Sequence, residues 1–456
     1  MMITDFDPII ALSTAQGRGG IGIVRLSFSA ALAEKVKDAL FPNFRLQARH
    51  AHLLPIQDAA DNVLDTVIVL FFPAPASYTG ESVLEIQAHG GPVVLRMIIN
   101  ACLQKCRSIG LRLAEPGEFT KRAYLNGKLD LLQAESVIDL IEASNETAAR
   151  AAQKSMSGRF SHEINDEAEK IKKLRVHVEA TLDFPEEEID PLGLSQVFTG
   201  ISEVCKEIDD LIDRSDKGKI LRDGVVVALV GSPNVGKSSL LNALAEDDVA
   251  IVTDIAGTTR DKIEHWIGIG GVPFCIVDTA GVRETNNPIE AAGIKRTLDA
   301  IGKADIVLHL TDASGAIAED PSICNSILKY LPQGAHSLRV ANKSDIAGIA
   351  TTVDSDLRIS AKTGQGIAEL KSKLLDLVQM NDIDGALCIA RERHIEHLRQ
   401  CMEHLRIALT MQDVPGSLDL LAEELRLAHD ALGAITGVTT ADDLLGSIFS
   451  TFCIGK

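Results

Sequence analysis

Short apolar runs alternate with turn-forming residues along the first 120 residues of the chain. Ile21–Leu26, Val67–Phe72 and Val83–Ile86 are examples of such runs. Apolar segments of this length, bounded by glycine, proline and polar residues, are typical of buried strands. We therefore predict an α+β N-terminal domain over residues 1–120.

A helical pattern replaces these short runs after the first domain. Proline is absent over Leu129–Asp183, where alanine, leucine, glutamate and lysine recur at helical spacing. The segment Phe184–Glu188 interrupts this pattern, and it resumes over Gln196–Ser215. We expect the helix to end there, because Asp216–Gly218 leads into an apolar run.

A further helical block begins near Ala390 and continues to residue 456. The two blocks predict one α-helical domain in two halves, residues 121–218 and residues 382–456. Between them the period changes, since Val225–Val230 is a β-branched apolar run followed by a turn and a helical pattern. Strands that alternate with helices indicate an α/β domain. We place this α/β domain at residues 219–381, inserted into the helical domain.

Composition limits the class of protein. At 456 residues and a hydrophobic share of 46%, the chain is long enough for two or three domains with cores of their own. Its first residues lack the pattern of a secretory signal, and no apolar run approaches the length of a membrane span. The eight cysteines show no paired CxxC spacing, which is typical of reduced thiols. We therefore expect a cytoplasmic protein without a membrane partner.

The net charge of −19 argues against a protein that wraps nucleic acid unaided, because binding to phosphates requires clustered lysine and arginine. The charge is uneven. Residues 1–130 hold 13 Lys+Arg and 12 Asp+Glu, so the acidity lies in the remainder of the chain. Any contact with nucleic acid should use this first segment or a partner protein, although an acidic surface can also simply keep a chain in solution.

A phosphate-binding loop follows the first strand of the α/β domain. The sequence is Gly231-Ser-Pro-Asn-Val-Gly236-Lys237-Ser238. In such a loop, backbone N–H groups and the N-terminus of the next helix hold anionic phosphates. Lys237 should reach the β- and γ-phosphates, and the Ser238 hydroxyl suits Mg²⁺, which prefers hard oxygen ligands.

Four further segments follow in the order that a GTP site requires. Gly257–Thr259 and Asp278–Gly281 are expected at the Mg²⁺ ion and the γ-phosphate, and Asn342–Asp345 with Ser360–Lys362 at the base. The carboxylate of Asp345 can accept two hydrogen bonds from guanine, whereas adenine would leave it unpaired. We therefore predict binding of GTP rather than ATP, and we interpret the α/β domain of residues 219–381 as a P-loop GTPase (Ras-like) domain. The predicted nucleotide-binding residues are Gly231, Asn234, Val235, Gly236, Lys237, Ser238, Ser239, Thr253, Asp254, Ile255, Ala256, Gly257, Thr258, Thr259, Asp278, Thr279, Ala280, Gly281, Asn342, Lys343, Ser344, Asp345, Ser360, Ala361 and Lys362.

The residue that orients the attacking water is not evident from these motifs. Val282 follows Asp-Thr-Ala-Gly at the place where Ras-like GTPases keep a glutamine, and valine cannot orient water. The charge of the transition state also needs a cation, for which Arg260, Arg283 and a bound monovalent ion are candidates. Asn234 and the loop 253–258 offer neutral oxygen ligands that suit such an ion.

The C-terminal segment is more apolar than a free tail. Ile448, Phe449 and Phe452 precede Cys453 and the final Ile-Gly-Lys456. We expect this segment to dock against the rest of the chain. An apolar environment would disfavour the thiolate of Cys453 and a nearby lysine would favour it, so its reactivity stays open.

Seven segments together resemble one family. They are Gly17–Arg25, Tyr78–Glu81, Glu85–Gly91, Pro116–Phe119, Asn126–Asp130, Asp254–Asp261 and Cys453–Lys456. With these segments the chain resembles, over its whole length, the MnmE (TrmE) family of tRNA-modification GTPases. Members of this family act on the wobble uridine of certain tRNAs.

The resemblance implies a homodimer that forms through the N-terminal domain and binds a tetrahydrofolate derivative in its 5-formyl or methylene form. By matched position, the implied folate contacts are Arg25, Glu85, Lys128 and Lys456. Cationic side chains can meet the glutamate tail of folate, and the carboxylate of Glu85 can accept the N–H donors of a pterin. Considered singly, each of these residues could be an ordinary surface charge.

The resemblance also implies that K⁺ and the pairing of two nucleotide domains replace an arginine finger. The implied K⁺ ligands are Asn234, Thr253, Ile255 and Thr258, and the implied Mg²⁺ ligands are Ser238 and Thr259. Glu290 is implied to position the attacking water through a second water, although a glutamate at a helix N-terminus is an alternative interpretation. The candidate catalytic residues are Glu290, Arg283 and Cys453.

These inferences predict a K⁺-dependent GTPase that acts in tRNA modification. The family implies a flavin-dependent partner, MnmG (GidA), and a carboxymethylaminomethyl or aminomethyl group formed at C5 of wobble uridine 34. No segment has the pattern of a dinucleotide-binding fold, so the flavin chemistry would belong to the partner. Two alternatives are a regulatory GTPase switch in ribosome assembly, like Era or Der, and a scaffold that only binds the partner.

Overall fold

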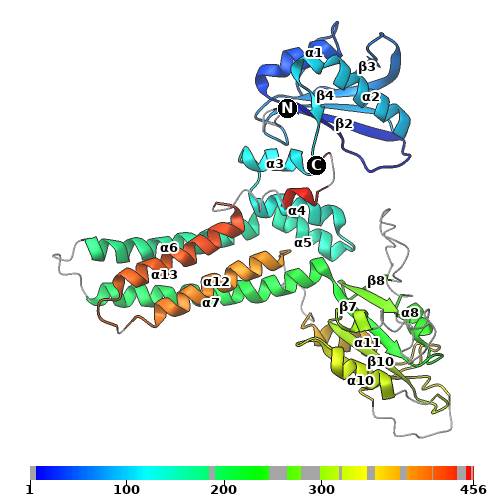
Figure 1. Cartoon of the computed structure of the whole chain (residues 1–456), viewed down its shortest axis with the longest axis vertical. Helices are drawn as coiled ribbons and strands as arrows, with labels where there is room; N and C mark the ends of the chain where they lie inside the picture. The colour runs from blue at the N-terminus through cyan, green and yellow to red at the C-terminus, as the bar shows by residue number, and fades with distance from the viewer. Residues whose placement is uncertain are drawn as a thin grey trace. The chain divides into compact units, whose positions relative to one another are not determined.

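The computed structural model forms two compact units, each with one six-stranded sheet (Figure 1). The first unit comprises Met1–Ile138, Gly158–Ala168 and His429–Lys456, and the second comprises Asp139–Ser157 and Glu169–Ala428. The structure describes residues 7–183, 191–245, 264–278, 298–317, 321–346, 355–380, 388–412, 414–438, 448–452 and 455.

The sheet of the first unit has the strand order β3-β4-β5-β2-β1-β6. The short strands β1 and β6 pair in parallel, and all other neighbours are antiparallel. The strands are β1 (Ile9–Leu12), β2 (Ile21–Phe28), β3 (His52–Gln57), β4 (Val63–Phe72), β5 (Ser82–His89) and β6 (Arg112–Leu113). The apolar runs predicted as strands therefore lie in β2, β4 and β5.

The two faces of this sheet are covered by different helices. Val24 of β2 and Leu84 of β5 point into a core with α1 (Ala33–Leu40) and α2 (Pro92–Lys105). On the opposite face, Ile9 of β1 packs with Phe119 of α3 (Glu118–Leu125). Because successive side chains of a strand point to opposite faces, the neighbours of Val24 and Leu84 in sequence lie on the α3 face. Two short 3₁₀ helices cover Ala30–Leu32 and Arg107–Ile109.

Long helices make up the region predicted to be helical. They are α4 (Leu131–Glu142), α5 (Glu146–Met156), α6 (Arg159–Asp183), α7 (Pro191–Asp223), α12 (Glu392–Leu409) and α13 (Leu418–Thr436). α7 and α12 lie side by side within the second unit. Among the described helices, none is both long enough and apolar enough to cross a membrane. The seven cysteines in the described ranges are all free thiols.

Helix α7 continues past the point where the sequence predicted its end. It reaches Asp223, so Asp216–Gly218 is helical and does not lead into the strand. A Cβ atom at Gly218 would lie 2.1 Å from the carbonyl oxygen of Cys388. The glycine therefore lets the chain that returns toward α12 pass directly against α7, and the helix tolerates it because packing outweighs its weak helix propensity.

The sheet of the second unit has the strand order β12-β11-β10-β7-β9-β8. β8 is antiparallel to β9, and all other neighbours are parallel. The elements are β7 (Val225–Gly231), α8 (Lys237–Ala245), β8 (Glu264–Ile269), β9 (Val272–Asp278), β10 (Ile306–Asp312), α10 (Pro321–Tyr330), β11 (His336–Asn342), β12 (Leu357–Arg358) and α11 (Ile367–Leu377).

Helices lie on both faces of this second sheet. Val227 and Leu229 of β7 pack in one core with α8 and α11, whereas Ala228 and Val230 pack in another with α10. A parallel sheet buried on both faces explains why β7 is an unbroken apolar run. The predicted fold class, with an α+β domain, a helical domain and an inserted α/β P-loop domain, is thus confirmed.

Candidate functional site

Four strands of the second sheet end at one edge. β7 ends at Gly231, β9 at Asp278, β10 at Asp312 and β11 at Asn342. The strand register places Asp312 opposite Asn342, and Gly231 opposite Leu310 two residues before the end of β10. Open α/β sheets bind ligands at the carboxyl ends of their strands. Three of the five predicted GTP segments therefore begin at the same edge.

The loop between β7 and α8 leaves no room for side chains at its two glycines. A Cβ atom at Gly231 would lie 2.5 Å from the carbonyl oxygen of Leu310. A Cβ atom at Gly236, whose φ is +100°, would lie 2.3 Å from Nδ2 of Asn342. Asn234 also adopts a left-handed conformation, with φ +64°. The backbone is therefore folded tightly enough to direct N–H groups toward an anion.

Helix α8 begins at the predicted phosphate-binding lysine. The ammonium group of Lys237 donates to the carbonyl of Gly231 at 2.9 Å, so the side chain folds back over the loop. Ser238 and Ser239 occupy the next two positions of the first helical turn. Val235 is buried in the core and contributes only its backbone to the loop. The helix N-terminus and the lysine thus lie together where the sequence predicts an anion-binding position.

Asn342 holds the phosphate loop and the base-recognition loops together. Its Nδ2 donates to the carbonyl of Val235 at 2.9 Å, and its Oδ1 accepts from the backbone N–H of Ala361 at 2.9 Å. Ser360 donates to Oδ1 of Asp345 at 2.6 Å. This hydrogen bond lowers the pKa of Asp345 below its usual range, which keeps the carboxylate ionised and able to accept.

The sequence interpretation missed Asp312 at the end of β10. Its carboxylate is fully buried and accepts from the ammonium group of Lys343 at 3.0 Å. Burial by itself would raise the pKa of Asp312, but hydrogen bonds from Ser314 and Lys343 outweigh it and hold the pKa below its usual value. Lys343 itself has φ +67°. The only signal in the sequence was an aspartate at the end of an apolar run beside the strand that carries Asn342.

Other predicted residues of the GTP site are described in part or not at all. Ser344 and Lys362 lie in the same two base-recognition loops. Asp278 is described only as the last residue of β9. The predicted residues outside the described ranges are Thr253, Asp254, Ile255, Ala256, Gly257, Thr258, Thr259, Thr279, Ala280, Gly281, Arg283, Glu290, Cys453 and Lys456.

A second cluster of predicted residues lies on the α3 face of the first sheet. Arg25 and Glu85 are direct partners in the register of β2 and β5. Nε and Nη2 of Arg25 lie 2.9 and 2.8 Å from Oε1 of Glu85, and the side chains are only 22% and 16% exposed. The guanidinium carbon lies 5.8 Å from the ring centroid of Tyr78 and 6.0 Å from that of Phe119. A charged pair beside aromatic rings can receive a planar ligand with N–H donors.

Lys128 reaches the same region through a loop. Residues 77–81 form the Ser77–Glu81 loop, in which Gly80 has φ +78°. A Cβ atom at Gly80 would lie 3.2 Å from Cγ of Lys128. Nδ2 of Asn126 donates to the carbonyl of Thr79 at 2.7 Å, which holds the chain beside Lys128 against this loop. The Ser77–Glu81 loop therefore lies against Lys128 at Gly80, and its Tyr78 ring lies beside the guanidinium of Arg25.

Gly455 lies beside β1 of the same sheet. The carbonyl of Gly455 accepts from Oγ of Ser13 at 3.2 Å. A Cβ atom at Gly455, whose φ is +101°, would lie 2.1 Å from the carbonyl oxygen of Leu12. Leu12 follows Ala11, which is the partner of Arg25 in the register of β1 and β2. Gly455 therefore lies beside β1, the strand that pairs with the strand of Arg25, whereas Lys456 lies outside the described residues.

The apolar residues before this end are docked, as the sequence predicted. Phe449 and Phe452 are 3% and 4% exposed and pack with Leu131 of α4. A Cβ atom at Gly117 would lie 2.5 Å from the carbonyl oxygen of Phe449, so only glycine allows this close approach. The docking holds Phe449 and Phe452 against α4 and against the backbone at Gly117.

Known proteins are similar in sequence to this chain along its whole length. Residues 8–128 match the family described as GTP-binding protein TrmE N-terminus, and residues 131–453 match the MnmE helical domain. The tRNA modification GTPase MnmE of Paraburkholderia xenovorans is 50% identical over 100% of both chains. The protein of the same name from Bordetella parapertussis is 52% identical over 99% of both chains. With this likeness over its full length, the chain belongs to the MnmE family of tRNA modification GTPases.

Proposed function

We propose that this chain is a K⁺-dependent GTPase that binds a tetrahydrofolate derivative and takes part in the modification of C5 of the wobble uridine of tRNA. A flavin-dependent partner protein of the MnmG type would share the reaction, and the product would carry a carboxymethylaminomethyl or aminomethyl group. The observation that supports the proposal is the ion pair of Arg25 and Glu85 beside the rings of Tyr78 and Phe119, with Lys128 against the loop that carries Tyr78. Relatives named tRNA modification GTPase support the choice of substrate. Because tRNA is the substrate, we place the activity in the cytoplasm.

GTP hydrolysis belongs to the strand edge of the second unit. Lys237 and the first turn of α8 would bind the β- and γ-phosphates, and Asp345 would accept the N–H donors of guanine. The Ser238 hydroxyl fits Mg²⁺, as a hard oxygen donor in the first helical turn next to the lysine. We assign the second Mg²⁺ contact to Thr259 and the positioning of the attacking water to Glu290.

K⁺ would supply the positive charge that an arginine finger supplies elsewhere. Asn234 fits such a role, because its amide oxygen is a hard and uncharged ligand and its left-handed backbone places it within the phosphate loop. Thr253, Ile255 and Thr258 would complete the shell. We further propose that two nucleotide domains pair around this ion, with Arg283 as the alternative source of charge.

The chemistry of the first unit fits a folate. Glu85 would accept the N–H donors of the pterin, and the ring of Tyr78 offers a stacking surface beside the guanidinium of Arg25. Lys128 and Lys456 would meet the carboxylates of the glutamate tail. When bound, the folate would supply the one-carbon unit of the modification. Cys453 stays a candidate for a reactive thiol, and two copies of the N-terminal domain would pair in a homodimer.

Mass spectrometry of tRNA nucleosides tests this proposal. The gene would be deleted, and the deleted strain would be complemented with the wild-type chain or with Lys237→Ala, which removes the phosphate-binding ammonium group. Lys105, partly exposed at the end of α2 in the other unit, provides the matched control Lys105→Ala.

We expect the modified wobble uridine to disappear on deletion and to return with the wild-type chain and with Lys105→Ala, but not with Lys237→Ala. A strain that keeps the modification after deletion would exclude the proposed activity. Ribosome assembly would then be the process to examine, as the switch alternative requires.

A further inference from the structure

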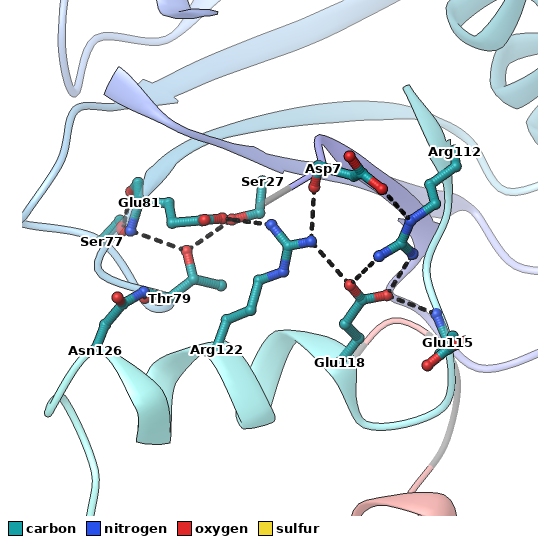
Figure 2. Close-up of polar contacts among 10 residues, drawn as sticks. All are labelled: Asp7, Ser27, Ser77, Thr79, Glu81, Arg112, Glu115, Glu118, Arg122 and Asn126. Carbon is teal, nitrogen blue, oxygen red and sulfur yellow. Dashed lines mark hydrogen bonds and ion pairs between the residues drawn. The ribbon is translucent and has the colours of Figure 1, made fainter. Parts of the chain in front are cut away.

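A buried network of charged side chains lies between α3 and the Ser77–Glu81 loop (Figure 2). Arg122 is 3% exposed, and its Nη1 donates to Oε2 of Glu81 at 2.9 Å. Its Nη2 donates to Oε1 of Glu118 at 2.8 Å and to the carbonyl of Asp7 at 2.6 Å. Glu118 also accepts two hydrogen bonds from Arg112, at 2.7 and 2.8 Å. Arg122 thus connects the loop to a second, buried carboxylate.

Such a network is not the most stabilising way to fill this space. Charges lose their hydration when they are buried, and apolar side chains of similar volume often give equal or greater stability. The network does specify one arrangement, because the two Nη atoms of Arg122 donate to three oxygens at fixed positions. The network acts most directly on the conformation of the Ser77–Glu81 loop, because Glu81 is the last residue of the loop and accepts the hydrogen bond from Arg122.

The loop is held at several further points. Oγ of Ser27 donates to Oε2 of Glu81 at 2.7 Å and shares a hydrogen bond with the hydroxyl of Thr79 at 2.8 Å. The hydroxyl of Ser77 donates to the carbonyl of Glu81. Figure 2 shows Arg122 reaching from α3 toward Glu81, with Asn126 at the end of the same helix holding Thr79. The loop therefore has a polar partner along most of its length.

The same helix sets the aromatic surroundings of Arg25. The hydroxyls of Tyr78 and Thr120 share a hydrogen bond of 2.9 Å, and Thr120 is fully buried. Phe119 precedes Thr120 in α3, and its ring centroid lies 6.0 Å from the guanidinium carbon of Arg25. The position of Tyr78 beside Arg25 thus depends on how the loop sits on α3.

We propose that Arg122 is a positioning residue for the ligand site of the first unit. By joining Glu81 to Glu118, it fixes the Ser77–Glu81 loop on α3 and so places the ring of Tyr78 beside Arg25, where the pterin ring of the folate would bind. Arg122 is itself buried and does not touch the ligand. This inference rests on the proposed function of the site as a folate site.

Binding of 5-formyltetrahydrofolate to the purified full-length chain, measured by calorimetry, tests this inference. Arg122→Met removes the ion pairs and keeps most of the side-chain volume. Arg112→Met is the matched control, because Arg112 also pairs with Glu118 but lies on the side away from the loop (Figure 2). Arg122→Lys keeps a cation in the network and serves as a variant that folds if Arg122→Met does not. Thermal unfolding of each variant is measured alongside.

We expect Arg122→Met to raise the dissociation constant about tenfold, a typical effect of losing the support of a ligand-contacting group. Arg122→Lys should recover part of the affinity. Arg112→Met should bind within about threefold of the wild type even if its unfolding temperature falls. Wild-type affinity in both Arg122 variants would overturn the positioning role.

A double-mutant cycle with Tyr78→Phe separates positioning from a general loss of stability. Tyr78→Phe removes the hydroxyl that ties the ring to Thr120. If Arg122 acts through the loop, the two substitutions affect the same structure, and their combined effect on binding is smaller than the product of the single effects. Fully independent effects would overturn the inference. A wild-type chain that does not bind the folate would overturn the folate proposal itself, and this inference with it.

Discussion

At the scale of single residues, one buried carboxylate, that of Asp312, organises the predicted GTP site. Asp312 was not predicted from sequence, because an aspartate at a strand end has many ordinary roles. The parallel register puts it opposite Asn342, and its bond to Lys343 joins β10 to the base-recognition loop. Lys343 itself was predicted from its motif, but the partner that holds it depends on the pairing of two strands, which the motif does not encode.

Substitution of Asp312 should weaken GTP binding. Asp312→Asn removes the charge that holds Lys343, at a cost of about 1.5 kcal/mol, or about tenfold in the dissociation constant. The affinity would be measured with a fluorescent GTP analogue. Asp305→Asn is the control, because Asp305 lies at the other end of the same strand, where its carboxylate accepts from the backbone N–H of Val226. Equal affinities of the two variants would contradict the assignment.

The charged network around Glu118 should make stability depend on pH. Burial alone would raise the pKa of Glu118, but hydrogen bonds from Arg112, the backbone of Glu115 and Arg122 hold it below the ordinary value of 4.5. The unfolded chain therefore binds this proton at a higher pH than the folded chain does. The ionised carboxylate stabilises the fold at pH values above the ordinary pKa of 4.5. This stabilisation is lost as the pH falls through the lower pKa of the folded state.

Thermal unfolding of the wild type and Glu118→Gln, followed from about pH 7 to about pH 3, checks this prediction. The unfolding temperature of the wild type should exceed that of the variant near neutral pH, and the difference should shrink toward the acid end. A difference that stays constant over this range would show that the ionised carboxylate does not stabilise the fold.

At the scale of elements, the apolar patterns predicted the strands better than the contacts between them. Val225–Val230 became β7 because a parallel strand buried on both faces is apolar throughout. The pairing of Arg25 with Glu85 joins residues 60 positions apart, and no local pattern encodes that register. The predicted end of α7 was wrong for a related reason. Gly218 indicates the end of a helix unless the segment packed against it is known.

The two segments that connect the helices to the inserted domain are both bound by the carboxylate of Asp139. Oδ1 of Asp139 accepts from Nε of Arg222 at 2.9 Å and from Nη2 of Arg391 at 2.8 Å. Arg222 lies at the end of α7, where the chain leaves for β7, and Arg391 precedes α12, where it returns. The backbone N–H of Ile389 donates to Oγ of Ser155 at 2.9 Å and strengthens the same junction.

Loss of this carboxylate should destabilise the second unit. Asp139→Ala leaves two largely buried guanidinium groups without their shared partner, which we expect to cost about 3 kcal/mol. Glu146→Ala is the comparison, because its pair with Arg150 is exposed and should contribute less than about 0.5 kcal/mol. Urea unfolding of the full chain measures both. An Asp139→Ala variant as stable as Glu146→Ala would contradict the role of the junction.

At the scale of the whole molecule, the chain combines two different binding chemistries. A phosphate-binding edge lies in the second unit, and a cluster of opposite charges beside aromatic rings lies in the first. The motifs predicted residues in both regions, and the roles of these residues stay a prediction. The boundaries of the four predicted segments stay a prediction, since the insertion of one domain into another leaves only gradual changes of pattern along the sequence.

The central claim is that GTP hydrolysis drives the modification of tRNA, and its most direct test is a reconstituted reaction. The purified chain, the proposed flavin-dependent partner, a one-carbon folate and unmodified tRNA would be combined with GTP or with a non-hydrolysable GTP analogue. Modified wobble uridine would be measured by mass spectrometry. We predict that the modified nucleoside forms with GTP in K⁺ and not with the analogue. Equal yields with GTP and with the analogue would contradict the account.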